Sequence, residues 1–306
     1  MWSGGGRSGS IAGPGEPSPT VHRVIRLDAA TVMQQWAVGG LFFLWITTRR
    51  REVGIGYGWL LRATFAIFAI GSLVLGVAFD FVAGREIGSA MVVAATLVAL
   101  VVSVLRRRAG VSGQREVQER RTARVAAMTG IDRDRQVFDK STSEFPPWLD
   151  LVAPLVGVIG LVAAGIDAGD PAALSVARVL VGAAFLGAIT DAMLLGHWYL
   201  VQPGLPRAPI LELVRWNAMV WPFELGVLLW PTGMVSVLNG NIDDHYNGLL
   251  GWFWIASSIT TIILIGVTRA ALKERAYSAV MAATGLLYLA ILTAFGMDVV
   301  ARALLS

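Results

Sequence analysis

Eight long runs of apolar residues, separated by short polar or charged stretches, constrain this chain more than any other feature of its sequence. An α-helix needs about 20 mostly apolar residues to cross a hydrocarbon core about 30 Å thick, and the runs have about that length or more. Only 15% of the residues are charged, against about 25% in a soluble globular chain, which excludes a soluble fold. We therefore predict an all-α integral membrane protein, a polytopic bundle of about eight transmembrane helices. The predicted spans are residues 29–48, 58–82, 87–105, 148–166, 172–202, 210–237, 249–267 and 276–304.

The segments outside the spans divide the chain. Residues 1–28 are rich in Gly, Ser and Pro and lack the apolar core of a cleavable signal peptide, so we expect a disordered N-terminal tail. Residues 29–105 carry the first three spans, and residues 148–306 carry the last five. Between them, residues 106–147 hold ten basic and six acidic side chains, which predicts one solvated, basic cytoplasmic loop rather than a folded domain.

The basic residues predict the orientation of the bundle. With eight alternating spans, 19 of the 25 Lys and Arg residues fall on one side of the membrane. Loops rich in Lys and Arg stay in the cytoplasm, so we expect this side to be cytoplasmic, both termini to be external, and the protein to lie in the cytoplasmic (inner) membrane. The sequence pI is about 9.8, but its basic residues flank apolar runs instead of covering a soluble face. We therefore expect the lipid bilayer as partner, with other membrane subunits as further partners, and no nucleic acid.

Polar side chains inside the spans are the strongest functional signal, because burying an ionisable group in lipid costs a few kcal/mol unless a partner or water meets it. They concentrate in spans 172–202 and 210–237, whose short connector rich in Pro and Gly predicts an antiparallel hairpin. The candidate ligand-binding or proton-relay residues are Asp191, His197, Tyr199, Arg215, Asn217 and Glu224.

The depth of each candidate follows from its distance along the helix, at about 1.5 Å per residue. His197 and Arg215 lie at similar distances from the connector, so we expect them to face one another. Asp191 and Asn217 share the next layer, and Glu224 lies deeper. The sequence thus predicts a polar intramembrane site between these two spans.

Each candidate also has a structural explanation. The rings of His197 and Tyr199 lie near a helix end, where aromatic side chains commonly form an interfacial belt. Arg215 can extend to lipid phosphates, or pair with Glu212 on its own helix. Asp191 and Glu224 would then make helix-to-helix hydrogen bonds instead of lining a cavity.

Three further carboxylates lie nearer the ends of predicted spans. We expect Asp298 to pair with Arg302, four residues later on the same helix. Asp80 and Asp150 are interpreted as residues at span boundaries.

The cofactor possibilities are narrow. The chain has no cysteine, which excludes iron–sulfur clusters and cysteine-bound metals within it, and no cluster of metal ligands is predicted. His197 is the one histidine inside a predicted span, so we do not expect a haem held by two histidines of this chain, while a haem with a single histidine ligand, or a quinone, is compatible with the sequence.

Three hypotheses about function remain open at this point, and with them the question whether the chain is an enzyme. The first is a quinone- and proton-handling subunit of a membrane redox complex. The second is a transporter of a small solute or ion, favoured by Pro222 and Pro231, which predict a break in span 210–237 beside a cavity. The third is a membrane scaffold or assembly protein without catalysis.

Overall fold

The computed structural model describes residues 28–113, 116, 143–202, 205–230 and 233–306. The predicted N-terminal tail except Asp28, and most of the predicted basic loop, lie outside these residues; Asp28 is ordered as the N-cap of α1. Every long element in the described part is a helix. The elements are α1 (Ala29–Thr48), α2 (Ile55–Phe79), α3 (Ala83–Leu105), the 3-10 helix η1 (Arg107–Ala109), α5 (Leu149–Ala168), α6 (Ala172–Val201), α7 (Ala208–Leu229), α8 (Met234–Leu238), α9 (Leu249–Ala271) and α10 (Tyr277–Leu305).

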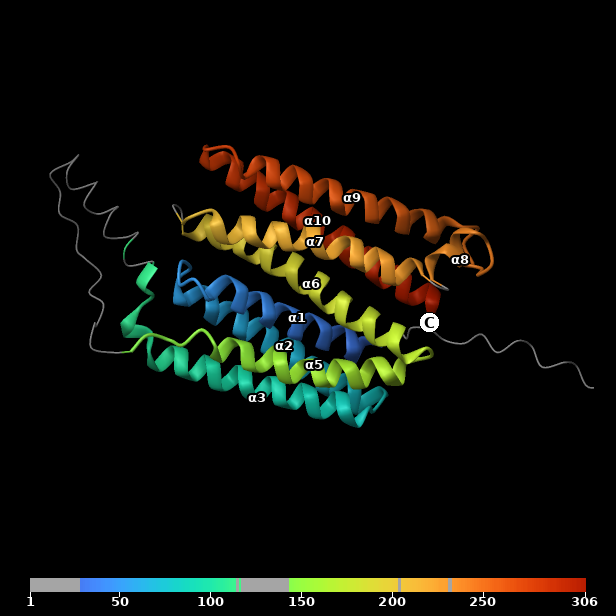
Figure 1. Ribbon diagram of the computed structural model, residues 1–306, viewed down its shortest axis with the longest axis horizontal. Coiled ribbons are helices and arrows are strands. Elements are labelled where there is room, and N and C mark those ends of the chain that lie inside the picture. The colour runs from blue at the N-terminus through green and yellow to red at the C-terminus, as the bar shows by residue number, and fades with distance from the viewer. Residues whose placement is uncertain (1–27, 114–115, 117–142, 203–204, 231–232) are drawn as a thin grey trace, which may run out of the picture.

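Seven of the described helices, all the long ones except α7, are long and apolar enough to cross a membrane. The helix α7 has 22 residues and lies lengthwise in the same bundle, but Glu212, Arg215 and Glu224 make it more polar (Figure 1). The chain is therefore a multi-pass membrane protein of the all-α class, as the sequence predicts. Its outer faces, covered with exposed large apolar side chains, are in contact with lipid.

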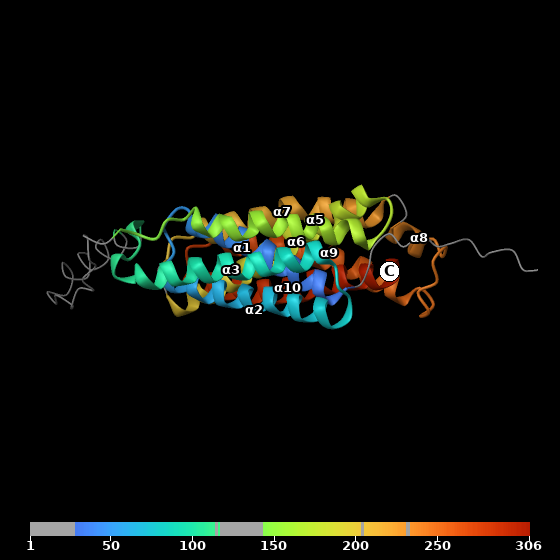
Figure 2. The ribbon, with the colours of Figure 1, turned by 90° about the horizontal axis from the view of Figure 1, so that it is seen from below.

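The helices α1 and α6 form the centre of the bundle. Each contacts the other and α5; α1 also contacts α2, and α6 also contacts α7 and α10. The helices α3 and α9 lie at opposite edges, while α2 and α10 lie on one side of the central pair and α5 and α7 on the other (Figures 1 and 2). As a result, α1 and α6 are the most buried of the seven membrane-length helices.

The bundle has two chemically different ends. One, called here the basic end, carries the turn after α1, the C-terminal ends of α3 and α9 and the start of α7, with arginines such as Arg50, Arg108 and Arg269. The other, called the Arg85 end, carries the starts of α1, α3 and α6 together with α8 and the C-terminus (Figure 1). The described basic residues of the loops thus gather at one end, which matches the alternation that the sequence predicts.

The predicted span 210–237 ends earlier than expected. The helix α7 continues through Pro222 but stops at Leu229, and α8 follows as a separate short helix. Trp230, the residue before Pro231, is extended, because the ring of a proline disfavours the helical conformation in the residue before it. The break therefore falls at the end of the bundle and not within it.

Outside the spans, Asp244 organises the turn that leads into α9. Its carboxylate accepts hydrogen bonds from the backbone N–H groups of Tyr246, Gly248 and Leu250, at 2.8 to 3.0 Å. Burial raises the pKa of Asp244, but these hydrogen bonds stabilise the charged form more strongly and hold the pKa below its ordinary value. The carboxylate thus fixes the start of α9.

The contact between α1 and α6 depends on two glycines. A Cβ atom on Gly187 would overlap the backbone of Gly39, and a Cβ atom on Gly39 would overlap the carbonyl group of Ala183. Backbones that approach this closely gain dispersion contacts along their length, which is how helices associate without a hydrophobic driving force in lipid.

We expect Gly187→Ala to lower the thermal unfolding midpoint of the purified protein, because the new methyl group must push α1 and α6 apart. Overpacking of this kind typically costs about 1–3 kcal/mol. The matched control is Gly266→Ala in α9, where a Cβ atom meets nothing within 4 Å. Equal midpoints for the two variants, measured by thermal melting in one detergent, would contradict this account.

Candidate functional site

Four ionisable side chains from three helices are buried together in the half of the bundle nearer the Arg85 end. They are Arg178 of α6, Glu224 of α7, and Asp298 and Arg302 of α10, called here the four-charge cluster, and none is more than 1% exposed. Arg302 Nε donates a hydrogen bond of 2.8 Å to Asp298 Oδ2, so the ion pair predicted from their spacing is confirmed. Glu224 interacts electrostatically with the other three residues. With both carboxyl groups ionised, the cluster has two positive and two negative charges.

Neighbouring residues make room for this cluster and anchor it. A Cβ atom on Gly182 would lie 2.9 Å from Arg302 Nη2 and 2.9 Å from Gln35 Nε2, so the glycine leaves space for both side chains. Gln35 of α1 donates a hydrogen bond of 2.6 Å to the carbonyl oxygen of Val179. Arg178 donates through Nε to the carbonyl oxygen of Val227, at 2.7 Å. The cluster is thus tied to both central helices and to α7.

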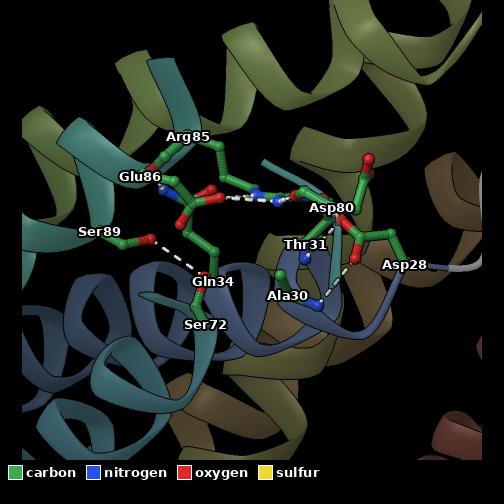
Figure 3. A network of polar contacts seen from close by, with 9 residues as sticks. All are labelled: Asp28, Ala30, Thr31, Gln34, Ser72, Asp80, Arg85, Glu86 and Ser89. Carbon is green, nitrogen blue, oxygen red and sulfur yellow. Dashed lines mark hydrogen bonds and ion pairs between the residues drawn. The ribbon is translucent and has the colours of Figure 1, made fainter. Parts of the chain in front are cut away.

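A second polar network, centred on Arg85, closes the same end of the bundle (Figure 3). The buried guanidinium group of Arg85 bonds the carboxylates of Asp28 and Glu86, the hydroxyl of Thr31 and the carbonyl oxygen of Asp80. Asp28 also caps the N-terminus of α1 through the N–H groups of residues 30 and 31. Asp80 is the residue that follows α2, in agreement with its interpretation as a boundary residue.

This network extends between α1, α2 and α3. Gln34 donates to the carbonyl oxygen of Arg85 at 3.2 Å, and the hydroxyls of Ser72 and Ser89 are 3.0 Å apart (Figure 3). Its contacts between Arg85 and the start of α1 join residues more than 50 positions apart, which the sequence alone does not reveal.

A small hollow links the two networks. It is lined by residues of α1, α3, α5, α6 and α10 and of the turn after α2: Asp28, Thr31, Asp80, Arg85, Ala164, Asp167, Ala168, Val179 and Arg302. Arg302 belongs both to this lining and to the four-charge cluster, and it also interacts electrostatically with Asp28. The hollow therefore reaches the four-charge cluster at Arg302.

Asn217 lies farther along α7, toward the basic end. Its side-chain Nδ2 donates to the carbonyl oxygens of Ala188, at 3.0 Å, and Leu213, at 2.9 Å. Its Oδ1 has no hydrogen-bond partner among the described residues. Asn217 and Glu224 are seven residues apart and share one stripe of α7, with about 10 Å between them along the axis.

Asp191 lies three residues after Ala188 on α6 and is fully buried. Neither oxygen of its carboxyl group has a hydrogen-bond partner in the part of the chain that the structure describes. Tyr57 of α2 interacts electrostatically with Asp191 and also with Tyr199, which is buried and donates its hydroxyl to the carbonyl oxygen of Pro206. These groups continue the polar contacts toward the basic end.

The structure does not bring His197 and Arg215 together as expected. Both side chains are exposed, and no hydrogen bond or ion pair joins them within the described residues. His197 is directed to α10 instead, with Nδ1 3.3 Å from the hydroxyl of Tyr288. Equal depth on two neighbouring helices does not fix the face on which each side chain lies.

One other prediction about pairing is wrong. Glu212 does not pair with Arg215 but accepts from Arg49 at 2.5 Å, because the arginines after α1 lie beside the start of α7. Asp150 lies at the start of α5, in agreement with its interpretation as a boundary residue. It also forms a buried ion pair with Arg62, in which Nε lies 2.7 Å from Oδ1 and Nη2 lies 2.7 Å from Oδ2.

Sequence reasoning missed the part that α10 plays in these arrangements. Asp298 lies more than 70 residues after Glu224, and Tyr288 lies more than 90 residues after His197. No local spacing in the sequence relates either residue to its partner. The one available signal was the presence of two opposite charges, Asp298 and Arg302, within an apolar run. Within the described residues, no group of three or more His, Asp and Glu side chains is arranged to hold a metal ion.

No protein-family model, curated protein or solved structure matches this chain. The functional argument therefore depends on its own residues.

We expect Asp298→Leu to destabilise the protein strongly, because Arg302 would remain buried without its carboxylate. Breaking a buried ion pair by removing one partner typically costs about 3–5 kcal/mol. Replacing both residues, in Asp298→Leu with Arg302→Leu, should restore much of the stability, since no unpaired charge is left. Thermal melting compares the two variants, and a double variant no more stable than Asp298→Leu alone would show that the pair has no such role.

Proposed function

We propose that this protein moves protons through the membrane, as a proton-coupled transporter of a small solute or ion, along buried polar groups at the α6–α7 contact. The observation that carries the proposal is Glu224, a buried carboxyl group that lies beside Asp298, Arg302 and Arg178. Buried ionisable groups in membrane proteins are costly and commonly mark ion and proton pathways.

The polar groups follow one another from one end of the bundle toward the other. The hollow at the Arg85 end reaches Arg302, which pairs with Asp298 beside Glu224. Asn217 lies about 10 Å farther along α7. It bonds the carbonyl of Ala188, which precedes Asp191 by a single helical turn. Water molecules would have to complete a proton path between groups at such spacings.

The charge balance of the four-charge cluster suggests how proton uptake is coupled to other events. Protonation of Glu224 changes the formal charge of the cluster from zero to +1, so that one arginine loses its compensating charge. A conformation or a bound anion that restores a net charge of zero in the cluster is then favoured. Proton uptake and this second event are coupled because each favours the other. In the orientation proposed from the basic loops, the Arg85 end is external and the basic end is cytoplasmic.

Quinone handling, as a subunit of a membrane redox complex, is the second candidate function. The contact between His197 and Tyr288 favours it, because this pair is exposed on the outside of the bundle, where a lipid-soluble ligand arrives. A scaffold, by contrast, requires helix packing but not buried carboxyl groups without partners such as Asp191.

We expect Glu224→Gln to reduce proton flux at least tenfold in proteoliposomes that contain the purified protein, a pH-sensitive dye and an imposed pH gradient. Glutamine keeps the shape of the side chain but cannot exchange a proton. The matched control is Glu274→Gln, a change at an exposed glutamate after α9, which should conduct like the unmodified protein. Unchanged flux in Glu224→Gln, or no flux above empty liposomes in the unmodified protein, would refute the proposal.

Asn217→Leu separates a relay role from a packing role. The carbonyl groups that Asn217 bonds lie within helices, and leucine removes a buried oxygen without a partner, so the unfolding midpoint should change little. If Asn217 holds water between Glu224 and Asp191, proton flux should fall about tenfold or more. A large loss of stability with normal flux per folded molecule would assign Asn217 to packing alone.

A further inference from the structure

A polar pair lies on the membrane-facing side of the bundle, where α6 meets α10. His197 and Tyr288, of which the latter is 42% exposed, both lie at the surface, and their rings are perpendicular, with the centroids 6.4 Å apart. Arg215, which the sequence predicts to face His197, is not part of this contact. The pair therefore presents the hydrogen-bonding atoms of a histidine and a tyrosine to the lipid phase.

The pair always has a free hydrogen-bond donor. If Tyr288 donates to His197 Nδ1, the histidine keeps an N–H group on Nε2; if Nδ1 donates to the tyrosine, the phenolic O–H group remains available. A ligand whose oxygen atoms accept hydrogen bonds suits both arrangements. A phosphate group is a poorer match, because phosphate sites in proteins prefer arginine or lysine.

A stack of three aromatic rings lies farther from the basic end, beside the same stretch of α6 and α10. The indole of Trp36 is stacked between Phe68 of α2, at 5.2 Å, and Phe295 of α10, at 5.0 Å, and all three rings are only partly buried. Trp36 Nε1 donates a hydrogen bond of 2.6 Å to the hydroxyl of Thr190 on α6. The stack is therefore held in place by α1, α2, α6 and α10 together.

The polar pair and the stack share one side of the bundle. Thr190 and His197 are seven residues apart and so lie on one face of α6, and Tyr288 and Phe295 have the same spacing on α10. Seven residues correspond to about 10 Å along a helix. A flat ring placed between the two layers would reach hydrogen-bonding groups at one edge and aromatic or apolar side chains at the other.

We propose that this surface binds the head group of a lipid-soluble quinone, with a ring carbonyl bonded by His197 or Tyr288 and the ring adjoining Trp36. Flat rings stack on aromatic side chains, carbonyl oxygens accept from the polar pair, and the apolar tail stays in the surrounding lipid. The role of this site in the protein rests on the proposed function. Asp191 directly follows Thr190 in α6, so protons from the bound head group would enter the proposed proton path at Asp191.

Photolabelling tests this proposal with protein reconstituted in phosphatidylcholine nanodiscs that contain no other quinone. The probe is an azido derivative of a short-chain ubiquinone, and decylubiquinone is the competitor. We expect label on peptides of α6 and α10 that include residues 190–197 or 288–295, and its loss with excess competitor. The double variant His197→Ala with Tyr288→Phe, which removes both donors, should reduce competitor-sensitive labelling by about tenfold, as expected for the loss of a good hydrogen bond.

The matched control is Tyr277→Phe, which removes the same hydroxyl from an exposed tyrosine at the start of α10 and should label like the unmodified protein. Label spread over the lipid-facing sides of α2 and α3, label that the competitor does not reduce, or normal labelling of the double variant would overturn the inference. A haem absorption band that disappears in His197→Ala would overturn it as well, by assigning the histidine to haem.

The quinone test is independent of proton flux. Glu224→Gln should keep the competitor-sensitive label, since Glu224 is not part of this surface. If Glu224→Gln loses proton flux and neither the unmodified protein nor any variant shows specific labelling, the proton proposal stands and the quinone site is rejected. If labelling is specific and Glu224→Gln has unchanged flux, the quinone site stands and the proton proposal is rejected.

Discussion

The cost of burying charge in a bilayer shapes this protein more than any other constraint. Among the residues that the structure describes, Arg62, Arg85, Arg178 and Arg302 are the largest fully buried side chains, and each has an acceptor for its guanidinium group. Arg62 and Arg302 are paired with single carboxylates, Arg85 with two, and Arg178 with a backbone carbonyl near Glu224. Because an unpaired charge in the interior would cost several kcal/mol, the helices must pack so that these pairs form.

The pairs connect helices that hydrophobic packing alone would leave free to slide or rotate. Lipid is as apolar as leucine, so burial of leucine against leucine hardly distinguishes one helix arrangement from another. An ion pair such as that between Arg62 and Asp150 is satisfied in only one register of α2 against α5. Close backbone contact at Gly39 and Gly187 adds a second directional restriction, between α1 and α6.

The proposed function depends on buried polar groups that helix packing leaves without a full set of hydrogen-bond partners. Glu224 lies next to compensating arginines, whereas Asp191 and one oxygen of Asn217 have no partner among the residues that the structure describes. Such groups lower stability unless water, a proton or a ligand meets them, and they are therefore the places where a membrane protein interacts with what it transports. The polar pair of His197 and Tyr288 differs, since it lies open to lipid.

The sequence by itself determined the all-α class, the approximate positions of the long helices and the pairing of Asp298 with Arg302, because length, hydropathy and four-residue spacing are local properties. It also singled out Asp191, Asn217 and Glu224, which are buried in the bundle. Only the tertiary structure decided that Glu224 meets Asp298 and that His197 meets Tyr288. Those choices depend on how each helix is rotated about its axis, and that rotation is set by contacts between residues far apart in the chain.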